Sequence, residues 1–154
     1  MKTKILHHLL TCFLMIISVL AFSQEDKEKI AIKNAVARET EAFMNLDHKT
    51  WSEAWLPATY AYWSYSDSTG TNFVDGWQNI DKTFDEYFRT QKPSKAKITN
   101  LWQEIRVYGN GAYVRFVQSV EDDIDKDQTS QVRVLEKKDG KWRIVCMNAI
   151  AKYK

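Results

Sequence analysis

The second half of the chain constrains the fold most, because four strand-like segments follow one another there with only short connections. These segments cover residues 96–108, 112–120, 128–137 and 142–153. The turns at 109–111 and 138–141 contain Asn-Gly and Asp-Gly, which tight β-hairpins favour because both residues tolerate positive φ. The sequence therefore predicts an antiparallel meander.

The first half of the chain has helical periodicity instead. Ile32, Val36 and Phe43 recur at roughly helical spacing, which predicts a helix over residues 25–46. Asp47 is a good N-cap for a short second helix that runs to Trp55. A further apolar stripe predicts a helix over 77–90, just ahead of a proline.

Two short segments between these helices are rich in strand-forming residues. Residues 59–66 contain three Tyr and one Trp, and residues 71–74 follow a turn over residues 67–70. The predicted order is helix, helix, strand, strand, helix and then four strands. Because helices precede a consecutive meander, the class is α+β, with helices packed on the concave side of a curved antiparallel sheet.

The first 23 residues resemble a secretory signal peptide. Lys2 and Lys4 precede a mostly apolar run from Ile5 to Leu20, and Ala21 and Ser23 are small residues at the positions that signal peptidases read. We expect residues 24–154 to form one exported domain, periplasmic or secreted, with no membrane attachment after signal removal. The alternative is an uncleaved anchor, which the short apolar run disfavours.

Charge and cysteine content exclude some functions. The chain has 22 Lys and Arg against 20 Asp and Glu, and loss of Lys2 and Lys4 leaves 20 of each. A neutral domain without a basic run gives no reason to expect nucleic acid binding. Only Cys146 remains after signal removal, so no internal disulfide can form, and we expect it to be a buried thiol.

Several local patterns carry a resemblance to a known family. They are Ala42-Phe43 ahead of Asp47 and Trp51, Val74-Asp75-Gly76 ahead of Ile80 and Phe84, the hairpin around residues 108–114, and the last hairpin from Leu135 through Val145. Their order and spacing resemble the nuclear transport factor 2-like (SnoaL-like) superfamily over nearly the whole mature chain. The resemblance implies a cone with an internal pocket. It also implies a homodimer through the outer sheet face, because such dimers are common in the superfamily.

The pocket candidates come from alternation along the last strand and from aromatic residues. Trp142, Ile144, Cys146, Asn148 and Ile150 alternate onto one face of a regular strand. Many relatives place polar groups at positions like Cys146 and Asn148, so Asn148 is a candidate ligand contact. Trp55, Tyr62 and Trp102 are candidate aromatic walls. The alternative for Asn148 is a strand-end residue satisfied by backbone or water.

A catalytic alternative uses Glu104 as a base, with Tyr60 or Tyr62 as a hydrogen-bond donor. A carboxylate buried in an apolar cone would have a raised pKa, which suits proton abstraction. The competing interpretation places Glu104 and Arg106 on the outer face as a solvated pair. A bulge in the strand would change which interpretation holds.

The sequence thus favours an exported protein that binds an apolar or ring-containing small molecule. The alternatives are an isomerase, dehydratase or cyclase, and an interaction module that docks through its outer sheet face. No cofactor is expected. His48 is the one histidine outside the predicted signal peptide, and the aspartates at 123, 125 and 127 lack a calcium loop's glycine and glutamate, so no metal site is expected.

Overall fold

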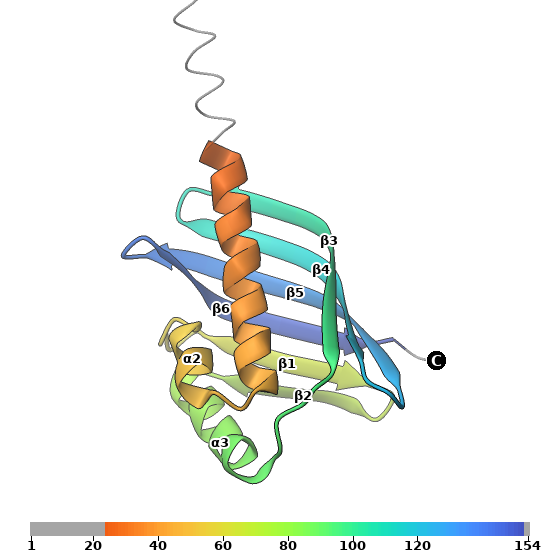
Figure 1. Ribbon diagram of the computed structural model, residues 1–154. Coiled ribbons are helices and arrows are strands. Elements are labelled where there is room, and N and C mark those ends of the chain that lie inside the picture. Colours follow the sequence, from red (N-terminus) through yellow and green to blue (C-terminus); the bar gives the residue numbers. More distant parts are fainter. Residues whose placement is uncertain (1–23, 153–154) are drawn as a thin grey trace, which may run out of the picture.

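The computed structural model describes residues 24–152. The predicted signal peptide lies outside the described residues. Residues 24–44 are helical, in agreement with the expected first helix, and this long helix crosses one face of the sheet in Figure 1. No helix among the described residues is long and apolar enough to span a membrane.

The two later helices begin near the predicted residues. Helix α2 (His48–Glu53) starts after Asp47, whose side chain accepts a hydrogen bond from the Thr50 backbone N–H at 3.0 Å. This is the expected N-cap geometry, since it satisfies a free amide of the first turn. Helix α3 (Trp77–Thr90) coincides with the predicted segment and follows Gly76, whose φ is 79°.

Within the described part of the chain, six strands form one sheet in the order β2-β1-β6-β5-β4-β3. Their bounds are β1 (Tyr62–Asp67), β2 (Gly70–Asp75), β3 (Lys97–Tyr108), β4 (Gly111–Glu121), β5 (Lys126–Lys138) and β6 (Lys141–Ala151). The expected order of helices and strands is confirmed. The sheet is mixed and not wholly antiparallel, because β1 pairs with β6 in parallel while the other four pairs are antiparallel.

The predicted hairpin between β5 and β6 has the expected backbone. Asp139 and Gly140 both have positive φ, at 53° and 74°. Two consecutive positive φ values are typical of the type I′ turn, whose twist matches that of the flanking strands. This local chemistry sets the pairing of Lys138 with Lys141 at the end of the hairpin.

Two bulges change which side chains face the helix. On β3 the register shifts between Trp102 and Glu104, and on β6 an extra residue, Val145, lies between the partners of Val134 and Leu135. Each bulge moves the following side chains to the opposite face, because the side-chain period of a strand is two. The single alternating face predicted from Trp142 to Ile150 is therefore interrupted.

The core lies between the covered face of the sheet and the helices. Ile32 and Val36 of the long helix are fully buried with Phe116, Leu135 and Ile144 of the sheet. Trp51 of α2 packs against Trp55, Trp77 and Phe84, with ring centroids 5.4–6.1 Å apart. This aromatic cluster joins α2 to α3.

Candidate functional site

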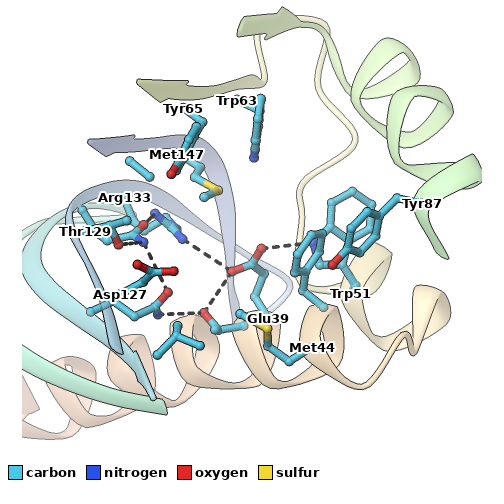
Figure 2. Close-up of a pocket in the computed structure, with 16 residues that line it drawn as sticks. Glu39, Met44, Trp51, Trp63, Tyr65, Tyr87, Asp127, Thr129, Arg133 and Met147 are labelled. Carbon is cyan, nitrogen blue, oxygen red and sulfur yellow. Dashed lines mark hydrogen bonds and ion pairs between the residues drawn. The ribbon is translucent and has the colours of Figure 1, made fainter. Parts of the chain in front are cut away.

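A cavity of about 460 Å³ lies between the long helix and the covered face of β1, β6, β5 and β4 (Figure 2). Its volume is within the range of ligand pockets. Sixteen of the described residues line it: Glu39, Thr40, Phe43, Met44, Trp51, Trp63, Tyr65, Tyr87, Gln118, Val120, Asp127, Thr129, Gln131, Arg133, Met147 and Ala149. The cavity thus combines an aromatic and thioether wall with a cluster of polar side chains.

The aromatic part of the described wall comes from four elements, which are the long helix, α2, β1 and α3. Trp63 and Tyr65 alternate with Ser64 on β1 and lie together in Figure 2, while Trp51 and Tyr87 lie on another side of the cavity. Tyr87 stacks on the ring of Phe43 with centroids 4.8 Å apart and an interplanar angle of 9°. These rings give the cavity a large apolar contact surface.

A buried ion pair forms the polar centre of the site. The Arg133 Nη2 atom lies 3.7 Å from Glu39 Oε2, and their side chains are 1% and 5% exposed. Trp51 Nε1–H donates to Glu39 Oε1 at 3.0 Å, and the Thr40 hydroxyl donates to Glu39 Oε2 at 3.4 Å. Burial lowers the pKa of the Arg133 guanidinium, and the Glu39 carboxylate opposes that shift by favouring the charged form.

A chain of side-chain amides continues from this pair along the sheet. Arg133 Nη1 donates to Gln131 Oε1 at 2.5 Å, and Gln131 Nε2 donates to Thr129 Oγ1 and to Gln118 Oε1. Gln118 Nε2 donates in turn to Thr40 Oγ1 and to Asn100 Oδ1. Both amide N–H groups of each glutamine are thereby used, so the network is largely satisfied within the protein.

The sequence contains a signal for this site that no catalytic or binding motif includes. Glu39 lies three residues after Val36 and four before Phe43, so it occupies the apolar stripe of the first helix. Arg133 likewise alternates with buried residues, between Gln131 and Leu135. A charged residue at an inward position needs a buried partner, but sequence alone does not show that these two residues meet.

The residues predicted on the last strand face away from the cavity. Met147 and Ala149 line the cavity, so the intervening Asn148 is on the outer face, where its amide donates to Ser64 Oγ at 2.7 Å. Cys146 is half-buried, and burial raises the pKa of its thiol while nearby Arg133 opposes the shift. The β6 bulge is the physical reason for this placement, and a ligand role of either residue stays a prediction.

The predicted aromatic walls are also placed outside the cavity lining. Trp102 is on the covered face, with its ring 4.9 Å from that of Phe116. Trp55 is buried in the core between α2 and α3. Tyr62 is on the outer face, next to Phe73 at 6.3 Å between ring centroids.

The residues of the catalytic alternative do not converge. Glu104 follows the β3 bulge and forms an ion pair with Arg106 at 2.9 Å, with side chains 37% and 63% exposed. This matches the competing interpretation from the sequence, in which Glu104 and Arg106 form a solvated pair on the outer face. The exposed Tyr60 hydroxyl donates to Glu136 on β5 at 2.9 Å, and β4 separates that strand from Glu104 on β3. Among the described residues, no three His, Cys, Asp or Glu side chains gather to hold a metal ion.

Comparison with solved structures shows a common fold at low sequence identity. An NTF2-like protein of unknown function from Shewanella oneidensis is 15% identical with a TM-score of 0.65, over 80% of this chain and 98% of the other. An NTF2-like protein of unknown function from Shewanella baltica is 22% identical with a TM-score of 0.60, over 83% and 96%. The association domain of C. elegans CaMKII is 19% identical with a TM-score of 0.65, over 82% and 97%.

These likenesses confirm the nuclear transport factor 2-like fold that the sequence suggested. No curated protein matches the sequence significantly. The family profile of the calcium/calmodulin dependent protein kinase II association domain matches residues 28–151, which covers most of the chain. The protein therefore belongs to the calcium/calmodulin dependent protein kinase II association domain family.

Proposed function

We propose that this domain binds a small molecule in the cavity beneath the sheet. The observation that carries the proposal is the combination of a space of about 460 Å³, an aromatic wall and a polar network whose hydrogen bonds are largely made within the protein. A cavity of this size lined by rings costs packing energy unless something occupies it, because its lining atoms lose dispersion contacts. Ligand binding gives a physical reason for keeping such a space.

The test uses a neutral fluorescent probe and two matched tryptophan variants. N-phenyl-1-naphthylamine should bind saturably with one probe per chain, because its fluorescence rises in apolar surroundings. Trp63→Ala removes a cavity-lining ring and should weaken probe binding about tenfold, since a buried aromatic contact is worth about 1–2 kcal/mol. Trp102→Ala removes a ring on the same face outside the cavity and should leave the affinity unchanged.

Equal weakening by both substitutions would show that the probe does not report on this cavity. Native mass spectrometry of the gently purified protein complements the probe. A reproducible extra mass that is lost in Trp63→Ala and retained in Trp102→Ala would supply the natural ligand for identification. An unliganded spectrum together with failure of the probe to bind would refute the proposal.

A second function, self-association through the outer sheet face, is favoured by a separate observation. Phe73 and Ile150 lie on that face and are 61% and 46% exposed, and Leu101 is also exposed there. Exposed apolar side chains on a sheet face are typical of an interface. The match to a family of association domains supports a homo-oligomer, of which a homodimer is the simplest form.

Charged substitutions on the outer face test the oligomer directly. The double variant Phe73→Lys/Ile150→Lys should shift the mass measured by light scattering toward that of one chain. Ile30→Lys is the control, because Ile30 is 58% exposed but lies on the long helix. A wild-type protein that is monomeric at high micromolar concentration would exclude this function.

Export from the cytoplasm is the third element of the proposal, and it rests on the sequence of the first 23 residues. Processing after Ser23 would leave a mature chain that begins at Gln24. N-terminal sequencing of protein recovered from the periplasm or medium of an exporting host would establish the cleavage site. Recovery of the full-length chain from the cytoplasm alone would contradict the expected localisation.

A further inference from the structure

The charges on the cavity lining do not balance. Among the described residues of the lining, three carry ionisable acidic or basic side chains: Glu39, Asp127 and Arg133. Glu39 and Arg133 neutralise each other as a buried pair. Asp127 is an exposed residue at the rim, at the start of β5, and within residues 24–152 its carboxylate makes no ion pair or side-chain hydrogen bond. Within the described residues 24–152, the lining therefore carries one negative charge without a compensating partner.

Arg133 is poorly placed to attract a negatively charged ligand. Its Nη1 donates to Gln131 Oε1 and to the Val132 carbonyl oxygen, and its Nη2 faces Glu39. Its Nε is enclosed by the protein and has no hydrogen-bond partner among the described residues. An anion at this guanidinium would have to displace Glu39, which Trp51 and Thr40 hold in place.

The rest of the wall has the chemistry that recognises organic cations. Trp63 and Tyr65 lie close together on β1, and Phe43, Trp51 and Tyr87 add further rings. The face of an aromatic ring carries partial negative charge and attracts a cation within about 6 Å of its centre. The polarisable sulfurs of Met44 and Met147 add to this wall, and Arg133 is the one cationic side chain of the lining that residues 24–152 contribute.

Because the rings and the rim carboxylate, which has no partner within residues 24–152, favour positive charge, we infer that the ligand is an organic ammonium compound, an amine or quaternary ammonium group on an apolar body. The apolar body would contact the rings, and the cationic group would lie over a ring face with Asp127 at the rim. This inference rests on the proposed small-molecule-binding function and specifies the class of ligand.

Three probes of nearly equal shape separate the charge from the rest of the ligand. Choline, 3,3-dimethylbutan-1-ol and 3,3-dimethylbutanoate share a branched head and differ in charge, being positive, neutral and negative. Isothermal titration of the protein at low salt should rank them in that order. Choline should bind about tenfold more tightly than the alcohol, which is the effect of a partly desolvated cation–π contact.

Two substitutions test the residues that carry the inference. Asp127→Asn should weaken choline about threefold to fivefold at low salt, with less effect at high salt, and leave the neutral alcohol unchanged, because an exposed carboxylate is screened. Asp123→Asn is the matched control, since Asp123 is exposed in the preceding loop and outside the cavity lining. Trp63→Leu should reduce the preference for choline over the alcohol by keeping bulk and removing the ring.

The outcomes distinguish the two proposals. Binding of the alcohol as tight as that of choline would refute the inference while leaving a ligand-binding cavity intact. Tighter binding of the butanoate would also refute it, and would show that Arg133 attracts the ligand despite Glu39. If none of the three probes binds at millimolar concentration and N-phenyl-1-naphthylamine does not bind either, both the ligand-binding function and the ammonium specificity are refuted.

Discussion

Replacement of Glu39 by Gln tests the central feature of the site, its buried ion pair. Gln has nearly the same shape and keeps an acceptor for the Trp51 N–H, so packing should change little. The substitution removes the counter-charge of Arg133, whose side chain is 1% exposed and whose Nη2 lies 3.7 Å from the carboxylate. The variant therefore isolates the cost of an unpaired buried cation.

The expected loss of stability is large for a near-isosteric change. Removal of one partner of a buried ion pair costs about 3–5 kcal/mol, because the remaining charge stays desolvated without compensation. Glu39 and Arg133 border a cavity that water can enter, so we expect the lower end, about 3 kcal/mol. Removal of both charges in Glu39→Gln/Arg133→Met should cost less than the sum of the single changes.

Urea denaturation at fixed protein concentration measures these free energies of unfolding, and the fixed concentration matters because the proposed self-association would add to stability. The control is Glu104→Gln, which breaks the exposed pair with Arg106. That pair is shorter, at 2.9 Å, yet should be worth less than about 1 kcal/mol because water screens it. A cost below about 1 kcal/mol for Glu39→Gln, or additivity in the double variant, would refute the ion pair as described.

Three further predictions follow from local contacts. Hydrogen bonds from Lys137 and the Trp142 indole lower the pKa of Glu28 from its ordinary value of 4.5. The contribution of these contacts to stability should therefore be fully present above about pH 5 and should be lost as the carboxylate is protonated at lower pH. In a pH series of thermal melts, Glu28→Gln should flatten this part of the curve. Burial raises the pKa of the Cys146 thiol, so iodoacetamide should label it slowly in native protein at pH 7.5 and rapidly in urea, and fast native labelling would contradict its burial. Gly76→Ala should cost about 1–2 kcal/mol in urea titration, because φ is 79° and the new Cβ would lie 3.3 Å from the Thr59 carbonyl oxygen, whereas Gly70→Ala, with open space around it, serves as the less crowded comparison.

Much of the fold follows from local sequence. The turn dipeptide Asp139-Gly140, the Asp47 N-cap and the limits of α3 are properties of neighbouring residues, and they appear in the structure as expected. The parallel pairing of β1 with β6 depends on where distant strands meet. No local pattern encodes that contact, and the sheet is mixed for this reason.

Local sequence does not predict which side chains of the bulged strands face the cavity. Alternation predicted that Asn148 faces inward, but the extra residue Val145 on β6 moves Met147 and Ala149 onto the cavity side instead. The β3 bulge likewise separates Glu104 from the face of Trp102. A bulge depends on how two strands pair and pack, so one strand's sequence does not reveal it.

The sequence by itself determined the elements, their order and the family resemblance, because helical period, strand alternation and turn chemistry are written in adjacent residues. It also contained two charges at inward positions, Glu39 and Arg133. Only the tertiary structure decided that these charges meet and that a cavity remains beside them. The physical reason is that a buried charge needs a partner of opposite charge. Glu39 and Arg133 are 94 residues apart along the chain, and only the packing of the helix on the sheet brings them together.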